Sequence, residues 1–268
     1  TLSSIQLAGL TTSQVAILTT AQFAAMTTTQ LTGALSASMV QSMSTAQFAQ
    51  LSATTLASLS VTQIAAIETS NVASLGTTQV AGLTTAQIAA LSTDQIVSLT
   101  TAQATSLTSS QLTSLTATQI KSMETADLAV ITTTNIALLK TSQISSMTTD
   151  QVQALGTSQV DALTTSQLNS FSTAMIKSLT TAQYGALTSH EFKSLSNTQI
   201  ASIDTNDLAV FNGNDLAGFS SAQIAVFTTE QINSLTTEQL TSLTTSQMVG
   251  MSATQIKVLS TDNMSSML

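Results

Sequence analysis

The sequence stands out first for the residue types that it lacks. It contains no proline, cysteine, tryptophan or arginine, and charged residues make up 7% and aromatic residues 3% of its 268 positions. Without cysteine it can form neither disulfides nor thiolate metal sites, which is compatible with an oxidising exterior. Ser, Thr, Ala, Leu and Gln supply most of the chain. Because this alphabet holds few groups for acid, base or nucleophilic chemistry, we expect no enzymatic activity and no cofactor.

Charge and hydropathy exclude two further classes of partner. Five lysines against 13 acidic residues give a formal net charge of −8, whereas a protein that neutralises nucleic-acid phosphates needs clustered Lys and Arg. Hydrophobic residues reach 43% but are scattered, and they never form the run of about 18 that would span a bilayer. We therefore predict no nucleic-acid partner and no membrane span.

An eight-residue repeat, here called the octad, fills the whole chain. The unit reads L-[TS]-T-x-Q-[ILV]-x-[AS], with a large apolar residue at position 1 and a second apolar residue at position 6. About 33 octads follow one another without a linker, and one nine-residue unit at 26–34 is the only change of length. The sequence therefore predicts a single continuous repeat solenoid over 1–268. Clear copies are LTTSQVAI (10–17), LTTAQIAA (83–90), LTTSQLNS (163–170) and LTTEQLTS (235–242).

The spacing of the apolar positions tests the conformation of the octad. In one long helix, which advances about 100° per residue, the apolar stripe would rotate by roughly 80° per octad and keep no common face. In a continuous strand, positions 1 and 6 would point to opposite sides of the sheet. Neither continuous element therefore buries both apolar positions together.

A very short capped helix fits the pattern. Ser or Thr at position 2 and Gln at position 5 form the capping box S/T-x-x-E/Q, and positions 1 and 6 are then the two residues of a hydrophobic staple. Helix dipoles favour this register as well, because 12 of the 13 acids sit at positions 2, 4 or 5 and four of the five lysines at position 7. The predicted capping residues are Thr11, Gln14, Thr84, Gln87, Thr236 and Gln239.

The predicted fold class is an all-α solenoid with one capped helical turn per octad. Such short helices are unstable alone, so stacking of successive turns must stabilise them, with small residues at position 8 allowing close approach. A β-solenoid, which Thr-rich pairs would suit, is the alternative, although the Gly, Asn or Asp expected at its corners occupy no fixed position. The predicted core includes Leu10, Val15, Leu83, Ile88, Leu163, Leu168, Leu235 and Leu240.

Few residues remain as candidates for chemistry. His190 is the one histidine, and Glu191 beside it replaces the usual Gln; a solvated His190 with Glu191 completing a capping box competes with an acid, base or ligand role. Asp204, Asp207 and Asp215 form the densest carboxylate group. They lack the ligand spacing of a calcium loop, so weak calcium binding is not favoured over local capping.

Three further features have two interpretations each. Phe211, Phe219 and Phe227 occupy position 1 of successive octads, either as core or as an assembly patch. The Gln column either caps helices or also forms an amide ladder between turns stacked in register. Rows of Thr resemble the hydroxyl-methyl arrays of ice-binding surfaces, although a capping Thr already uses its hydroxyl.

The tandem LTTAQ and LSTDQ units resemble the Ser/Thr/Gln-rich octad arrays of large bacterial surface proteins described as adhesins. This resemblance implies an extracellular or cell-surface location and a filament or stalk, with an adhesin module or a Thr-array ice-binding protein as alternatives. The array starts one residue before an octad and stops two residues into the next. We therefore expect continuation into a longer array, or self-association end to end or laterally.

Overall fold

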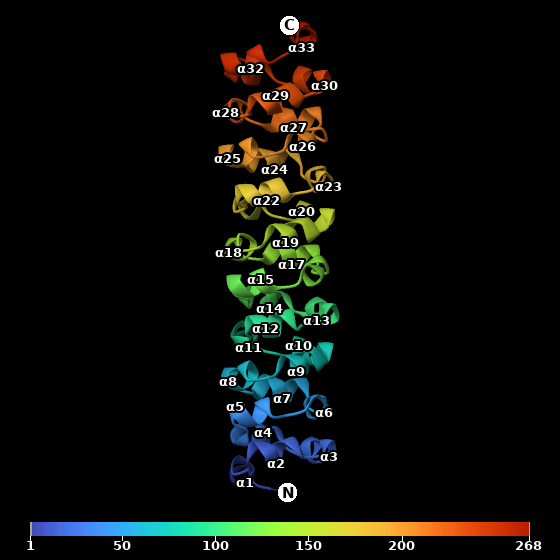
Figure 1. Ribbon diagram of the computed structural model, residues 1–268, viewed down its shortest axis with the longest axis vertical. Coiled ribbons are helices and arrows are strands. Elements are labelled where there is room, and N and C mark those ends of the chain that lie inside the picture. The colour runs from blue at the N-terminus through green and yellow to red at the C-terminus, as the bar shows by residue number, and fades with distance from the viewer. Residues whose placement is uncertain (1, 268) are drawn as a thin grey trace. The chain divides into compact units, whose positions relative to one another are not determined.

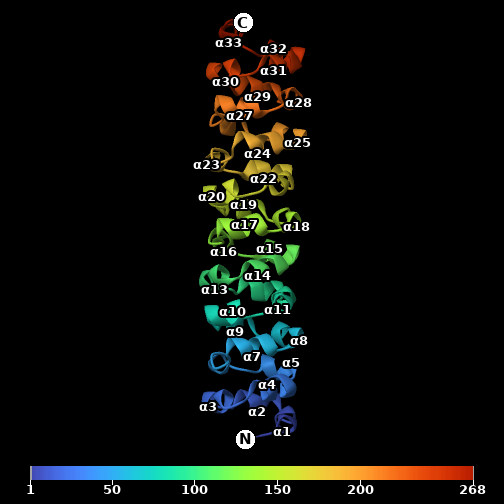
Figure 2. The same cartoon turned by 180° about the vertical axis from the view of Figure 1, so that it is seen from behind.

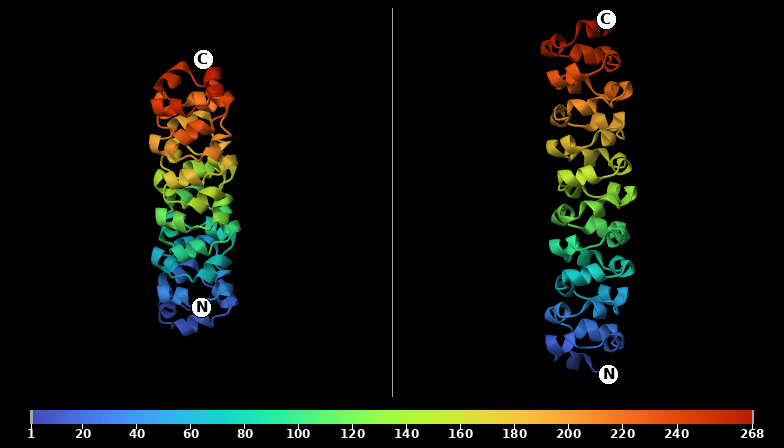
Figure 3. Two further views of the ribbon diagram at one scale, coloured as in Figure 1. Left: turned by 45° about the horizontal axis from the view of Figure 1, so that its top comes forward. Right: turned by 45° about the vertical axis from the view of Figure 1, so that its right-hand side comes forward.

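The computed structural model describes residues 2–267 as short α-helices joined by one or a few extended residues. No strand occurs among these residues, as the two views in Figure 3 also show. The prediction of an all-α repeat solenoid is therefore confirmed, and the β-solenoid alternative is wrong for this part of the chain. The helices divide into two compact units, unit 1 up to Leu139 and unit 2 from Lys140 onward.

Unit 1, residues 2–139, contains one helix of four to seven residues in each repeat. Its helices are α1 (Ser4–Ala8), α2 (Thr12–Ala16), α3 (Thr20–Ala24), α4 (Thr28–Ala34), α5 (Ala37–Gln41), α6 (Thr45–Phe48), α7 (Ala53–Ser58), α8 (Val61–Ala65), α9 (Thr69–Ser74), α10 (Thr77–Ala81), α11 (Thr85–Ala90), α12 (Thr93–Val97), α13 (Thr101–Ser106), α14 (Ser109–Ser114), α15 (Ala117–Ser122), α16 (Thr125–Ala129) and α17 (Thr133–Leu138).

Unit 2, residues 140–267, repeats the same design. Its helices are α18 (Thr141–Ile144), α19 (Thr149–Ala154), α20 (Thr157–Asp161), α21 (Thr165–Asn169), α22 (Thr173–Ser178), α23 (Thr181–Tyr184), α24 (Ser189–Ser194), α25 (Asn197–Ala201), α26 (Thr205–Leu208), α27 (Gly213–Gly218), α28 (Ser221–Ile224), α29 (Thr229–Ser234), α30 (Thr237–Thr241), α31 (Thr245–Gly250), α32 (Ala253–Lys257) and α33 (Thr261–Met267).

From α1 to α32, each helix follows an extended N-cap residue in position 2 of its octad. At α11 the N-cap Thr84 has φ −71° and ψ 158°, and the chain leaves the helix at Leu91, which is also extended with φ −61° and ψ 139°. Other helices, such as α2, end on a residue in the αR region, here Ile17, but an extended N-cap still interrupts the helical backbone once per octad and changes its direction. The octad is thus one helical turn and one corner.

Three octads make one turn of the solenoid. In unit 1 every helix from α1 to α14 contacts the helix three places later, and in unit 2 the same spacing joins, for example, α18 to α21 and α28 to α31. Helices α5, α8 and α11 accordingly lie one above another in Figure 1, and again in the opposite view of Figure 2. The pattern within a single octad did not reveal how many octads complete a turn.

The core consists of the apolar residues at positions 1 and 6. Val15, Leu168 and Leu240 at position 6 are fully buried, while Leu83 at position 1 retains 6% of its surface. The other predicted core residues Ile88, Leu163 and Leu235 are buried as well. Leu10 is only half-buried, because the turn that contains it has no earlier turn above it in the described residues.

Small residues at position 8 set how closely two turns approach. A Cβ atom added to Gly82 would lie 2.6 Å from the Cβ of Ala53 in the turn before, and one added to Gly218 would lie 2.9 Å from that of Ser189. Two Cβ atoms cannot lie so close to each other. Glycine at these positions therefore allows the backbones of neighbouring turns to approach this closely. The nine-residue unit, in contrast, adds its extra residue to α4, which has seven residues.

Candidate functional site

The capping box recurs along both units with nearly constant geometry. In α11 the backbone N–H of Gln87 donates to Thr84 Oγ1 at 3.2 Å, and Gln87 Oε1 accepts from the Thr84 N–H at 2.9 Å. Thr11 with Gln14 and Thr236 with Gln239 make the same pair of bonds. The Gln half persists where the N-cap is Gly76, Gly156 or Lys140, none of which caps through its side chain.

Acidic residues at position 2 behave differently. Glu68, Glu124 and Asp204 each precede a helix, but none makes a side-chain cap hydrogen bond. Glu68 instead accepts from Gln41 Nε2 at 2.7 Å, and Asp204 lies 3.8 Å from Lys177 in an exposed ion pair. At the helix start these carboxylates therefore interact favourably with the helix dipole, and Glu68 and Asp204 also contact residues of an earlier turn, but none of the three forms the capping box.

The Gln side chain has a second bond, made by its amide nitrogen. Gln87 Nε2 donates to the carbonyl of Leu59 at 2.7 Å and to that of Leu56 at 2.8 Å, which lie 28 and 31 residues earlier. Gln103 and Gln239 repeat both spacings in units 1 and 2. We call this column the glutamine ladder; its rungs run from side chain to backbone, so the amides do not bond one another.

The ladder explains why the octad holds Gln where a capping box also permits Glu. Both side chains offer an oxygen to the N-cap N–H, but only the amide also carries a donor. The carbonyls of Leu56 and Leu59 lie at the C-terminal end of α7, where carbonyls lack the full set of helical partners; that of Leu56 accepts only from the Leu59 N–H within its own octad. One Gln thus satisfies the start of its own helix and the end of an earlier one.

Shorter residues at position 5 replace the rung with another contact. Asn135 Oδ1 accepts from Ser109 Oγ at 2.7 Å, and Asp207 Oδ1 accepts from Thr181 Oγ1 at 2.7 Å, in both cases from a hydroxyl 26 residues earlier. Asn71, which is equally short, keeps one bond of the rung and donates to the Met43 carbonyl at 2.8 Å. Asn135 and Asp207 therefore keep a bond between turns, but to a hydroxyl in place of a backbone carbonyl.

Asp127 is the exception with an unsatisfied atom. Its side chain is 2% exposed, and its Oδ2 has no hydrogen-bond partner. Burial raises the pKa of this carboxyl above 3.8, a hydrogen bond from Thr101 lowers it, and the neighbouring Glu124 raises it. A deprotonated Asp127 therefore puts a buried charge where other octads place an amide.

Tyr184 supplies a missing donor next to Asp207. The residue 31 places after Ile176 is Asp207, whose ionised side chain has no donor for the Ile176 carbonyl. The fully buried Tyr184 hydroxyl donates to that carbonyl at 2.7 Å. Burial, followed by the charges of Asp207 and Asp204, raises the pKa of the phenol far above 10, so the hydroxyl keeps its proton.

The three phenylalanines of the possible assembly patch are buried in unit 2. Phe211, Phe219 and Phe227 retain 2–3% of their surface, and Phe211 packs against Phe192 with ring centroids 4.2 Å apart. Phe219 meets Phe227 edge to face at 5.5 Å. This burial favours the core alternative, because the rings offer no free surface to a partner.

The candidates for chemistry do not converge. His190 is exposed on α24, and Glu191 completes the capping box by accepting from the Thr188 N–H at 2.8 Å. Asp204, Asp207 and Asp215 each have a different partner, Asp215 accepting from the Asn212 N–H at 3.0 Å. Across residues 2–267 no three His, Asp or Glu side chains gather as metal ligands.

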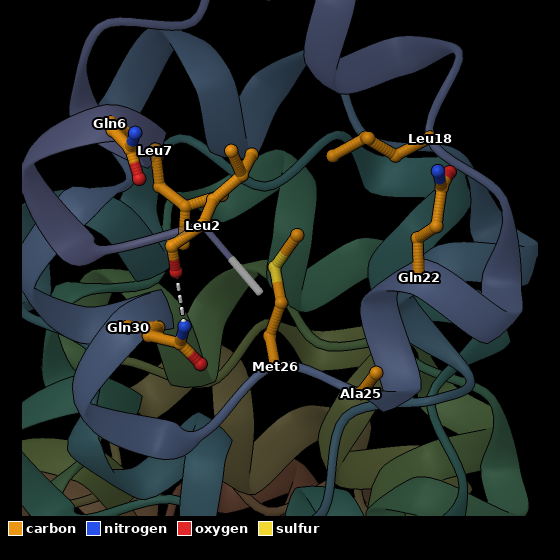
Figure 4. A pocket seen from close by; sticks show the side chains of 8 residues that line it. All are labelled: Leu2, Gln6, Leu7, Leu18, Gln22, Ala25, Met26 and Gln30. Carbon is orange, nitrogen blue, oxygen red and sulfur yellow. Dashed lines mark hydrogen bonds between the residues drawn. The ribbon is translucent and has the colours of Figure 1, made fainter.

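A cavity opens at the N-terminal end of unit 1. It measures about 450 Å³ and is lined by Leu2, Leu18 and Met26 with Gln6 and Gln22 at its sides. Figure 4 shows these apolar side chains pointing into the space, and below them Gln30 Nε2, which donates to the Leu2 carbonyl at 2.6 Å.

The helices within residues 2–267 are all too short to cross a membrane. This agrees with the membrane prediction made from the sequence, since no element has the length and apolar character of a span.

A comparison with known protein families finds a match to the octads. The sequence model of the ALTTAQ repeat matches residues 64–101, 120–157, 160–197 and 200–237, together more than half of the chain. The chain belongs to the ALTTAQ repeat family. Each ALTTAQ match covers nearly five octads, and the four copies lie in tandem, as expected of a repeat array. No curated protein matches the chain.

The ALTTAQ signature contains the residues that build the solenoid. Its Leu is position 1, its Thr-Thr pair gives the N-cap and first helical residue, and its Gln is the rung of the ladder. Sequence reasoning found the capping role of this Gln but left the ladder open. The excess of Gln over Glu at position 5, where Glu191 is the one Glu, was the available signal.

Proposed function

We propose that this ALTTAQ repeat protein is a non-catalytic structural protein that forms an extracellular filament or stalk by coiling and stacking octads. The observation that carries the proposal is that the recurring side chains of the octad all stabilise the solenoid itself. The Thr or Ser caps, the Gln joins turns, and the apolar residues are buried, as Thr84, Gln87 and Ile88 illustrate. The positions left to solvent vary from octad to octad.

The extracellular part of the proposal rests on composition and resemblance. A chain without cysteine needs no reducing compartment, and its octads resemble arrays of large bacterial surface proteins. Labelling of intact bacterial cells with an antibody against the chain tests the location. Signal only after permeabilisation would contradict a cell-surface role.

Small-angle X-ray scattering of the purified chain, with negative-stain microscopy over a concentration series, tests the structural role. We expect either an extended particle or fibres one solenoid wide. A compact particle at every concentration would contradict both the stalk and the filament.

An adhesin module or a Thr-array ice-binding protein is the alternative function. Each would need a surface whose side chains are free to contact a target, yet the hydroxyls at position 2 accept from the helix, as Thr11 Oγ1 does from the Gln14 N–H. Binding of the labelled chain to cell surfaces, or thermal hysteresis of its solutions, would support this alternative over the structural role.

A further inference from the structure

Two octads carry an acidic residue at position 2 together with another at position 5. The first is METADLAV (123–130) in unit 1, with Glu124 and Asp127, and the second is IDTNDLAV (203–210) in unit 2, with Asp204 and Asp207. In both octads the carboxylate at position 5 replaces the amide of the glutamine ladder, so it brings a negative charge and no donor when ionised. The two octads therefore need compensating partners of the same kind.

The acidic pair of unit 2 is compensated by two side chains of earlier octads. Lys177, which stands 27 residues before Asp204, lies 3.8 Å from it in an ion pair. Tyr184 donates to the Ile176 carbonyl at 2.7 Å, where Asp207 offers no amide. A cation and a donor thus accompany these two carboxylates, and this octad has no need of a positive ion from solution.

The acidic pair of unit 1 has neither of these compensating side chains. Each residue of its surroundings lies 80 positions before its counterpart in unit 2, so Val97 stands in the place of the lysine and Ala104 in that of the tyrosine. Val97 is 42% exposed and uncharged, and Ala104 is the smallest residue at position 6 of any octad. Glu68, another acid at position 2 of unit 1, does have a donor 27 residues earlier, since it accepts from Gln41. Glu124 therefore differs from both of the other acids at position 2.

Oxygen atoms that lack a donor adjoin Asp127. Its Oδ2 has no hydrogen-bond partner, although the side chain is 2% exposed. A ladder rung from this position would reach the carbonyls of Leu99 and Ile96, 28 and 31 residues earlier, to which a carboxylate offers no donor. Glu124 is exposed, makes no cap hydrogen bond, and lies near enough for its charge to act on Asp127. Two carboxylates and two carbonyls are thus available to one positive ion.

We propose that Asp127, Glu124 and the carbonyls of Leu99 and Ile96 form a calcium site. Calcium takes about six to eight oxygen ligands from carboxylates, backbone carbonyls and water in a flexible arrangement, whereas magnesium demands a regular octahedron and gives up its water reluctantly. Asp127 Oδ2 supplies the buried charged ligand, and Glu124 and water complete the shell on the solvent side. The ion joins α16 to the C-terminal end of α12, where other octads use the rung of the glutamine ladder.

Isothermal titration calorimetry with calcium chloride, on protein first treated with a chelator, tests the site. Asp127→Gln removes the buried ligand and restores the residue that most octads hold at position 5, so it should not impair folding. Glu124→Thr restores the usual N-cap in the same way. Asp207→Gln is the matched control, because it removes a carboxylate from the compensated pair. Circular dichroism checks that every variant keeps the helix content of the unmodified chain.

We expect the unmodified chain to bind one calcium ion with a Kd of about 0.1–1 mM, as in extracellular modules. Asp127→Gln should weaken binding by about 30-fold or more and Glu124→Thr by about 3–10-fold, since affinity follows the charge and number of the ligands. Asp207→Gln should change the Kd by less than about twofold, because calcium does not contact it. Calcium should also raise the melting temperature of the unmodified chain and leave that of Asp127→Gln almost unchanged.

Three results would overturn the calcium site. They are the absence of saturable binding to the unmodified chain, equal weakening by Asp127→Gln and Asp207→Gln, and an equal rise in melting temperature with sodium chloride at the same ionic strength. None of these results would affect the structural role proposed above, which does not depend on a bound ion.

Discussion

The hydroxyl of Tyr184 donates to the carbonyl of Ile176 at 2.7 Å, across eight residues. This bond lies where a ladder rung is missing, because Asp207 stands at the position that would reach Ile176. An aromatic residue at position 6 thus compensates for a carboxylate in the next turn. The relationship shows that octads are not independent, although each follows the same local rules.

Tyr184→Phe should lower the free energy of unfolding of unit 2 by about 1–2 kcal/mol, because the buried Ile176 carbonyl loses one of its two donors and keeps only the backbone N–H of Leu179. Urea denaturation followed by circular dichroism measures the change. In an Asp207→Gln background the same substitution should cost less, since the new amide reaches the carbonyl. An identical cost in both backgrounds would show that the Tyr184 hydroxyl does not replace the rung.

Gln87→Glu should destabilise unit 1 by about 3 kcal/mol, because the carboxylate keeps the cap but lies buried against the carbonyls of Leu56 and Leu59. Gln14→Glu is the matched control, since Gln14 is exposed and its Nε2 has no rung to lose. We expect the control to change stability by less than about 0.5 kcal/mol. Similar losses for the two variants in thermal denaturation would mean that the second bond contributes nothing.

Gly82→Ala should destabilise unit 1 by about 1–3 kcal/mol, because the new Cβ would lie 2.6 Å from Ala53 and force two turns apart. Gly33→Ala is its control, as no atom lies within 4 Å of the added Cβ. The control should be neutral or stabilise the helix by up to about 1 kcal/mol. Thermal denaturation should give Gly82→Ala the lower melting temperature of the two variants. Equal melting temperatures would mean that the close approach at Gly82 does not matter.

Asp127 should make unit 1 less stable as the pH rises. Its pKa in the folded chain is raised above the reference value of 3.8, so the folded state holds its proton more tightly than the unfolded state. The loss of unfolding free energy caused by ionised Asp127 is therefore absent below pH 3.8. It grows as the pH rises from there through the pKa of Asp127 in the folded chain. Asp127→Asn should remove this part of the pH dependence, which denaturation at pH 3 to 7 measures; an unchanged profile would place the effect elsewhere.

Local rules predicted the octad well and the relation between octads poorly. The N-cap at Thr84, the box closed by Gln87 and the buried Ile88 follow from one unit of sequence, because capping and the staple act within a single octad. The three octads per turn and the bond from Gln87 to Leu59 depend on how turns stack, and no spacing inside one octad sets that. The role of Tyr184 could not be predicted for the same reason, since the rung that its hydroxyl replaces is missing because of Asp207 in the next turn.

A turn of three octads also governs how such an array can change its length. Loss or gain of one octad leaves every glutamine with an equivalent carbonyl in the turn before, so recombination between repeats preserves the fold. All later side chains, however, rotate by about a third of a turn to the neighbouring face. Only a change of three octads restores each exposed residue to its original column, so surface features that must line up along the array evolve in steps of one whole turn.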